Sequence, residues 1–187
     1  EVVQRVFNHA GFATLILVDE QCTPDPDFPT VAFPNPEEPG AIDLALAKAR
    51  EVDADLVIAN DPDADRCAAA INDPVLGWRM LRGDELGIIF GEWIARTHPK
   101  GTFGNSIVSS SALRKICAHY RINFQEVLTG FKWLAKIEDL AFGYEEAIGY
   151  SVDSKTVNDK DGVSAAIFLA QIASDLAKSG LTLTDLL

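Results

Sequence analysis

Short apolar runs alternate with longer amphipathic segments along most of this chain, and this alternation limits the possible fold more than any other feature. Continuous apolar runs, such as residues 13–18 (ATLILV) and 54–59 (ADLVIA), are typical of buried strands. Residues 40–52 show the spacing of an amphipathic helix. Strand, crossover helix and strand form a right-handed βαβ unit with a parallel sheet, so the sequence predicts an α/β protein.

The same pattern predicts further elements on both sides of residue 80. Helices are expected over residues 1–11, 82–96, 112–120, 131–140 and 161–178. Strands are expected over residues 67–71, 79–81, 105–110, 123–128 and 141–146. We therefore expect two consecutive α/β domains with mixed or parallel sheets, residues 1–80 and 81–187.

Two segments do not fit a simple strand or helix. The proline-rich residues 22–40 are too stiff for a helix and predict an ordered excursion over the surface. Residues 181–187 (LTLTDLL) read as the cap and first turn of a helix that does not continue. No strand precedes the first helix, although a βαβ layout expects one. The chain is therefore expected to be an N-terminally truncated middle part of a larger protein.

Composition excludes several classes of function. The 187 residues include 28 acidic and 16 basic side chains, giving a formal net charge of −12. Such a surface disfavours nucleic acid and anionic membrane as partners. The three cysteines are widely spaced and form no C-x-x-C pair, which is typical of reduced thiols. No apolar run approaches the ~18 residues of a membrane span, and no signal peptide precedes the first helix, so a cytoplasmic protein is expected.

The strongest chemical signal is the segment ANDPDADR at residues 59–66. Asp61, Asp63 and Asp65 stand at alternate positions directly before Arg66. Because carboxylates this close repel one another and lose hydration, a divalent cation is their natural neutraliser. An EF-hand is excluded, since the sixth position counted from Asp61 holds Arg66 in place of glycine. A phosphatase of the haloacid-dehalogenase type fits poorly, because Asp65 stands where that class has Thr or Val.

The loop resembles the D-G-D-G-D-R metal loop of the α-D-phosphohexomutases, the phosphoglucomutase/phosphomannomutase family, with Pro62 and Ala64 in place of the glycines. Other motifs similar to the second and third domains of that family follow in order: PNPEEPGAI, LRGDELG, SIVSSSALRKI, LTGFKWL, GYEEAIGY and NDKDGVSAA. Matches in one order over nearly the whole chain are far more specific than any single motif. LTGFKWL and GYEEAIGY look most like the branch with phosphomannomutases, phosphoglucomutases and phosphopentomutases of the longer type.

The resemblance implies a phosphoryl transfer between the 1- and 6-positions of a hexose phosphate, through a phosphoserine and a bisphosphorylated sugar. Asp61, Asp63 and Asp65 would bind one Mg²⁺, whose remaining ligand is a phosphoserine oxygen. The metal would neutralise charge on the transferring group. Arg66 would lie beside it as a fixed planar cation, and Lys160 matches a family lysine at the cleft.

The resemblance also implies a sugar-binding set. Gly130, Phe131 and Lys132, in LTGFKWL, would lie at the cleft, and Glu145, in GYEEAIGY, matches the glutamate that hydrogen-bonds sugar hydroxyls. The family often has Ser where this chain has Ala147. That difference removes one hydroxyl contact and leaves glucose, mannose and pentose phosphates open as the sugar phosphate substrate.

Two family features are missing from this sequence: the T-A-S-H-N-P phosphoserine loop and the terminal phosphate-binding loop. SSSAL at residues 109–113 reads instead as a strand end followed by a helix cap. The resemblance therefore implies that domains 1 and 4 of the same polypeptide complete the enzyme, and that the isolated chain is inactive. The alternatives are a phosphopentomutase of the same family, a metal-dependent phosphatase with Asp61 as nucleophile, and a cation-binding module without phosphate chemistry.

Overall fold

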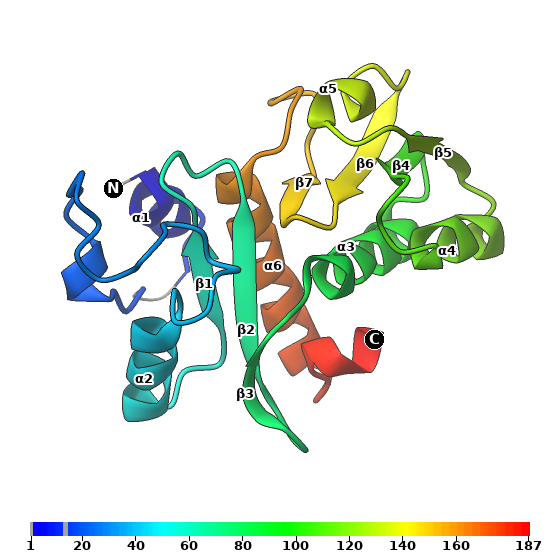
Figure 1. Ribbon diagram of the computed structural model, residues 1–187. Coiled ribbons are helices and arrows are strands. Elements are labelled where there is room, and N and C mark those ends of the chain that lie inside the picture. The colour runs from blue at the N-terminus through cyan, green and yellow to red at the C-terminus, as the bar shows by residue number, and fades with distance from the viewer. Residues whose placement is uncertain (1, 13–14) are drawn as a thin grey trace.

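A computed structural model describes residues 2–12 and 15–187 as a mixed α/β architecture with two sheets (Figure 1). In chain order its elements are α1 (Val2–His9), η1 (Asp19–Gln21), α2 (Asp43–Val52), β1 (Val57–Asn60), β2 (Cys67–Asp73), β3 (Gly77–Met80), α3 (Gly83–Thr97), β4 (Thr102–Ser106), α4 (Ala112–Tyr120), β5 (Asn123–Val127), α5 (Phe131–Leu134), β6 (Leu140–Glu145), β7 (Gly149–Ser151), α6 (Gly162–Ala177) and η2 (Leu183–Leu186). The α/β class predicted from the sequence is confirmed.

The first sheet has the strand order β1-β2-β3, and both pairings are antiparallel. Its central strand, β2, is buried from Cys67 to Ile71 because helices cover both faces. Helix α2 packs on one face through Ala49, which lies beside Val57 and Ala70. Helix α6 packs against β1 and β2. The sheet is thus a meander with helical cover.

The predicted parallel βαβ unit is wrong. The expected strand at residues 13–18 falls partly outside the described residues, and residues 15–18 have no strand. Ile16 in this run is 56% exposed. Strand β1 pairs instead with β2 across a short loop, as the register between Asn60 and Cys67 shows. An apolar run alone thus fixes neither the burial of its side chains nor the partner of a strand.

The second sheet has the strand order β5-β4-β6-β7, with β4 parallel to β5 and β6, and β7 antiparallel to β6. Helices α3 and α4 pack against each other and against this sheet. Helix α5 packs against β4 and β6 and contributes Phe131 and Leu134 to a small cluster with Ile137 and Leu140. The mixed sheet agrees with the predicted class.

Two predicted elements in this half differ from the structure. The expected strand over residues 105–110 is β4, which ends at Ser106; Ile107 and Val108 lie in a turn and are each 57% exposed. The expected helix over residues 131–140 is one turn, α5, because Leu140 already begins β6. In both places apolar side chains beyond the end of the element made the predicted strand or helix too long.

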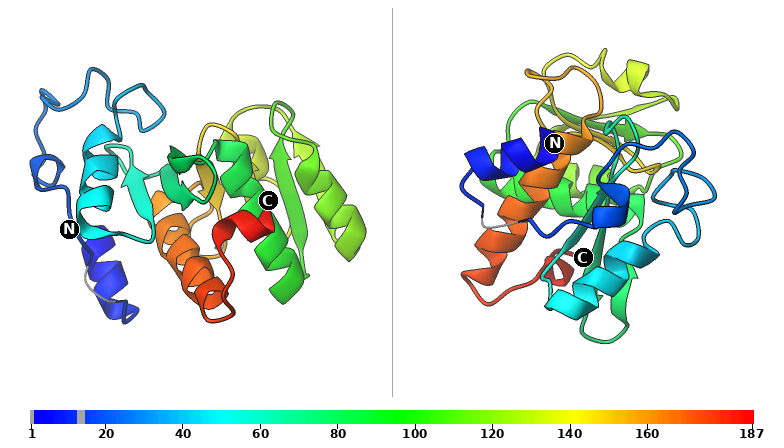
Figure 2. Two further views of the ribbon diagram at one scale, coloured as in Figure 1. Left: turned by 90° about the horizontal axis from the view of Figure 1, so that it is seen from below. Right: turned by 90° about the vertical axis from the view of Figure 1, so that its left-hand side faces the viewer.

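Helix α6 lies between the two sheets (Figures 1 and 2). Most buried side chains form one cluster that runs from Phe7 in α1 to Leu186 in η2, across both halves of the chain. The domain boundary at residue 80 stays a prediction from the sequence. Helix α6 belongs to the second half by sequence, but it packs against β1 and β2 of the first half. Among the described residues, no helix has both the length and the apolar composition needed to cross a membrane.

The close approach of α3 to β6 depends on a glycine. A Cβ on Gly87 would lie 2.6 Å from two ring carbons of Tyr144. The Tyr144 ring is fully buried, and its hydroxyl donates to Asp84 Oδ1 (2.8 Å), so it has little room to move. Asp84 is held by this bond inside the first turn of α3, after the N-cap residue Arg82.

We predict that Gly87→Ala destabilises the fold. Overpacking costs about 1–3 kcal/mol, more than the gain of about 1 kcal/mol from better helix propensity. The free energy of unfolding, measured in urea, should fall by up to roughly 2 kcal/mol. Ala118→Gly, at an exposed position of α4, is the matched control. It should destabilise by up to about 1 kcal/mol because nothing there competes with propensity. A Gly87→Ala protein more stable than the parent would contradict this packing.

The cysteines predict a labelling pattern. Burial raises the pKa of both Cys67 and Cys117 to about 12, whereas Cys22 is exposed. Because the thiolate is the reactive form, the two buried thiols should not react at pH 8. An aromatic disulfide reagent should therefore titrate one thiol in the folded chain and three in denaturant. Rapid titration of a second thiol under native conditions would show that one buried site opens readily.

Candidate functional site

The three aspartates lie in the loop that joins β1 to β2, residues 61–66. The Asn60 side chain closes the loop by donating to the Arg66 carbonyl (2.7 Å). Ala64 has a positive φ of 57° and its N–H donates to Asp61 O (3.0 Å), which makes a tight turn. The loop then rests on the start of α6, where the Gly162 N–H donates to Ala64 O (3.1 Å). Helix and hairpin thus hold the loop in one shape.

Two cations lie among these carboxylates. The Arg66 Nε–H donates to Asp61 Oδ2 (2.6 Å), and the Arg66 backbone N–H donates to Asp61 Oδ1 (3.0 Å). Lys160, two residues before α6, forms an ion pair with Asp65. The side chain of Asp61 is 2% exposed, whereas Asp63 is exposed and Asp65 is half-buried. The site therefore combines one buried carboxylate with two that ligands can reach.

Pairing of opposite charges shifts the pKa values of Asp61, Arg66 and Lys160. Burial alone would raise the pKa of Asp61, but the hydrogen bonds and charge of Arg66 outweigh it, and the pKa is lowered. Burial likewise disfavours the charged forms of Arg66 and Lys160, which alone would lower the pKa of each. The pKa of each is nevertheless raised, that of Arg66 by Asp61 and that of Lys160 by Asp65. These shifts keep Asp61, Arg66 and Lys160 charged at neutral pH.

The carboxylates fit a hard divalent cation. Asp61, Asp63 and Asp65 each offer an oxygen, and these oxygens lie within 4.8 Å of one another. Opposite ligands of an octahedral Mg²⁺ lie about 4.2 Å apart, a spread that small side-chain rotations would reach. Carboxylate oxygens are also the donors that Mg²⁺ and Ca²⁺ prefer. The predicted metal-binding loop is therefore compatible with the geometry.

A cavity of about 330 Å³ opens beside this loop. It brings together six of the residues singled out from the sequence, which line it with Ala147 and Gly149: Asp61, Asp63, Asp65, Arg66, Glu145 and Lys160. Glu145 ends β6 and comes from the other sheet, so the cavity lies between the two halves of the chain. Its size suits a small polar molecule.

The three residues of the LTGFKWL motif do not line this cavity. The Gly130 N–H donates to Glu145 Oε1 (2.6 Å) and so touches the site indirectly. Phe131 is buried with Leu134 in the cluster beneath α5. Lys132 is exposed, with its Nζ 5.8 Å from the centre of the Trp133 ring.

Sequence reasoning missed Gly149 and Gly162 at the site. A Cβ on Gly149 would lie 3.1 Å from the Lys160 side chain, and one on Gly162 would lie 2.2 Å from the Arg66 carbonyl. Glycine is needed at position 162 because backbone atoms occupy the space of a side chain, whereas at position 149 the flexible Lys160 side chain would have to shift by a few tenths of an ångström. Both glycines stand inside the motifs GYEEAIGY and NDKDGVSAA, and their place near the predicted site residues Glu145 and Lys160 was the available signal.

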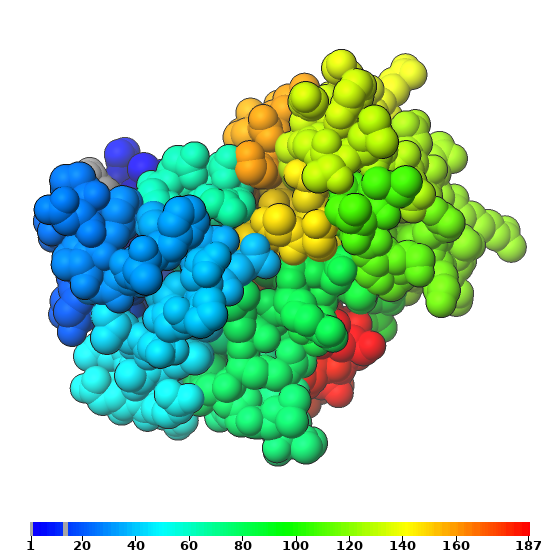
Figure 3. All heavy atoms as spheres, viewed as in Figure 1, coloured from blue at the N-terminus to red at the C-terminus, as the bar shows by residue number. Residues whose placement is uncertain are grey.

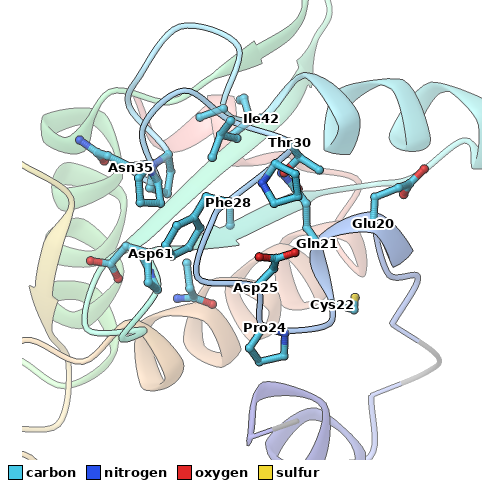
Figure 4. A pocket seen from close by; sticks show the side chains of 18 of the residues that line it. Glu20, Gln21, Cys22, Pro24, Asp25, Phe28, Thr30, Asn35, Ile42 and Asp61 are labelled. Atoms are coloured by element: carbon cyan, nitrogen blue, oxygen red, sulfur yellow. The ribbon is translucent and has the colours of Figure 1, made fainter.

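A second, larger cavity of about 560 Å³ adjoins the loop at Asp61 and Pro62 (Figure 4). The proline-rich segment lines it, with Phe28 and Asn35 on the side of Asp61. Figure 3 shows this segment in blue, running over the surface of the first half. The predicted ordered excursion is thus present, and Asp61 lines both cavities.

Fold and site together define an α/β protein with a carboxylate cluster and two cations at a cavity between its two sheets. Comparison with known proteins gives the family. Residues 1–77 match alpha/beta/alpha domain II of phosphoglucomutase/phosphomannomutase, and residues 82–187 match alpha/beta/alpha domain III. The chain belongs to the phosphoglucomutase/phosphomannomutase family, as its motifs indicated.

Individual relatives carry several names. The chain is 46% identical over 187 residues to a "Probable phosphomannomutase" of Haemophilus influenzae, covering 99% of this chain and 39% of that protein. It is 41% identical over 204 residues to a mouse phosphopentomutase, covering 99% and 33%. A family protein from Burkholderia thailandensis has the same fold, with a TM-score of 0.80 at 19% identity, over 94% of this chain and 37% of that one. The chain thus spans about a third to two fifths of these proteins.

We predict that Asp63→Asn weakens binding of Mg²⁺ by tenfold or more, on the order expected when one of three charged ligands is lost. Isothermal titration calorimetry on the 187-residue chain measures this directly. Glu51→Gln, which removes an exposed carboxylate paired with Lys48, is the control and should leave the affinity unchanged. Equal Mg²⁺ affinity in the Asp63→Asn and parent proteins would exclude the aspartate triad as the metal site.

Proposed function

We propose that this chain supplies the metal-binding and sugar-binding parts of a Mg²⁺-dependent phosphohexomutase of the phosphomannomutase/phosphoglucomutase type. The whole protein would move a phosphoryl group between the 1- and 6-positions of a hexose phosphate. The observation that carries the proposal is the cavity of about 330 Å³ in which three aspartates, two cations and Glu145 face one space. Its donors match a phosphorylated sugar: cations for phosphate and a carboxylate for hydroxyls.

Each residue has a role that follows from its chemistry. Asp61, Asp63 and Asp65 would hold the Mg²⁺, which when bound neutralises charge on the transferring phosphoryl group. Arg66 is fixed by Asp61 and supplies a planar cation for phosphate oxygens. Lys160 adds a second positive charge beside Asp65. In a chain of net charge −12, these local cations oppose the repulsion of an anionic substrate.

The sugar would be held by the second half of the chain. Glu145 lines the cavity, and Gly130 uses one of its oxygens, which leaves the other for hydroxyls. Lys132 lies close to Gly130 in sequence and is exposed, so it could meet the distal phosphate. Phe131 would act by anchoring this loop, since its side chain is in the core beneath α5. Phosphoryl transfer depends on such positioning and on charge stabilisation.

The phosphatase alternative requires Asp61 to act as a nucleophile. Both its oxygens accept hydrogen bonds from Arg66, and these bonds lower its basicity. A bare cation-binding module would gain nothing from Arg66 and Lys160, since they repel a metal. A phosphopentomutase is the alternative within the same family, supported by the 41% identity to the mouse relative.

Activity measurements on the whole gene product test the proposal. It should interconvert glucose 1-phosphate and glucose 6-phosphate, or the mannose pair, only with Mg²⁺ present. Preferential turnover of ribose 1-phosphate would instead support the phosphopentomutase. Release of inorganic phosphate without isomerisation would support a phosphatase. Binding of Mg²⁺ with none of these activities would leave a cation-binding module.

We predict that Glu145→Gln lowers kcat/KM of the whole gene product ten- to a hundredfold, a loss of roughly 1.4–2.8 kcal/mol. The amide keeps the shape, but it loses the charge that strengthens bonds from sugar hydroxyls. Mg²⁺ affinity should not change. Glu138→Gln, at an exposed carboxylate before β6, is the control. If Glu145→Gln keeps the parental kcat/KM on every hexose and pentose phosphate tried, the sugar must be bound by Lys132 and its neighbours instead.

A further inference from the structure

A closed ring of hydrogen bonds surrounds Glu146, the neighbour of Glu145. Ser106 Oγ–H and Ser109 Oγ–H both donate to Glu146 Oε2, at 3.0 and 2.9 Å. The Glu146 backbone N–H donates in turn to Ser109 Oγ (3.1 Å), and the two serine oxygens lie 2.8 Å apart. Ser109 therefore contacts both the side chain and the backbone of Glu146, which fixes the direction of the chain at this residue.

The serine side of this ring is itself rigid. Ser106 ends β4 and is fully buried. In the turn that follows, the Ser110 N–H donates to Asp84 Oδ1 (2.6 Å), and the Ser110 carbonyl accepts from the buried Asn105 side chain (2.9 Å). The turn is thus tied to α3 and to β4. Glu146 is bound to a fixed support.

The β6–β7 turn, residues 146–148, is also held from the side of the first sheet. A Cβ on Gly83 would lie 1.7 Å from the Glu146 carbonyl oxygen, so α3 begins in direct contact with the turn backbone. The Ile148 carbonyl accepts from the Cys67 N–H (3.0 Å), next to Arg66. The turn that follows Glu145 is therefore joined to the start of β2, directly after the acidic loop.

Uncharged hydrogen-bond donors hold the carboxylates of Glu145 and Glu146. Among the described residues, neither Glu145 nor Glu146 has a Lys or Arg within ion-pair distance. Two serine hydroxyls and a backbone N–H orient Glu146 and Glu145 instead. Arg66 and Lys160 are thereby not drawn away from the cavity. A carboxylate held by hydroxyl donors keeps a defined direction without an added cation.

We propose that Ser109 and Glu146 form a positioning pair, which sets the backbone at Glu145 so that its carboxylate meets sugar hydroxyls in the cavity. The pair touches no substrate and acts through Glu145. The inference rests on the proposed function and adds to it the group that controls sugar affinity. Loss of the pair would loosen the turn at Glu146, and Glu145 would then have to become ordered when the sugar binds. The effect falls on KM, not on the metal site.

The first test uses steady-state kinetics on the whole gene product. Ser109→Ala should raise KM for the sugar phosphate about five- to tenfold and change kcat less than twofold, with Mg²⁺ affinity unchanged. Ser109→Thr keeps the hydroxyl and should restore most of the affinity. Ser111→Ala, at an exposed serine of the same turn, is the matched control and should match the parent. An unchanged KM in Ser109→Ala overturns the proposal.

The second test does not need activity. The Gly130 N–H donates to Glu145 Oε1, so its hydrogen exchange measured by NMR reports where that carboxylate lies. In the 187-residue chain, Ser109→Ala should speed exchange at Gly130 about fivefold or more, and Ser109→Thr should reverse this. Equal exchange in Ser109→Ala and the parent overturns the positioning role. A parent without mutase activity refutes the proposed function alone, because the exchange result still decides the inference.

A third variant covers loss of folding. Should Ser109→Ala fail to fold, Glu146→Gln keeps an acceptor oxygen for the serines and loses the charge that strengthens their bonds. Glu146→Gln should raise KM for the sugar phosphate and speed hydrogen exchange at Gly130, each about two- to threefold. Parental KM and parental Gly130 exchange in Glu146→Gln would then overturn the proposal.

Discussion

The packing of α6 against both sheets determines where the acidic loop lies relative to Glu145. The helix contacts β1 and β2 of one sheet and β7 of the other. Three consecutive residues at its start do different work: Lys160 pairs with Asp65, Asp161 caps the helix through the Val163 and Ser164 N–H groups, and Gly162 meets the loop backbone. One helix end thus connects a charge, a cap and a close backbone contact.

The sequence predicted local features well and pairings poorly. The helices α3, α4 and α6 and the turn-forming acidic loop have signals within a few residues, and they lie close to where they were expected. Strand partners are set by contacts far along the chain, so the antiparallel pairing of β1 with β2 was missed. Exposed apolar side chains such as Ile107 and Val108 also imitate a strand, because the one-dimensional pattern cannot distinguish exposure from burial.

The candidate site shows the same division. The spacing of Asp61, Asp63 and Asp65 indicated a metal-binding loop without knowledge of the fold. Glu145 lies about eighty positions further on, and only the resemblance to a family linked it to that loop. The ring around Glu146 had no signal at all, because serines before a helix read as caps. Polar networks that join distant segments are the part of a site that spacing does not reveal.

The contact between Gly162 and Ala64 has a consequence for how the protein is made. The acidic loop leaves the ribosome almost a hundred residues before the helix end that supports it. At synthesis rates of about 5–20 residues per second, this delay lasts roughly 5–20 s. Over that interval the nascent loop is an unsupported cluster of negative charge. The contact that supports its final shape forms only once α6 has been translated and has docked.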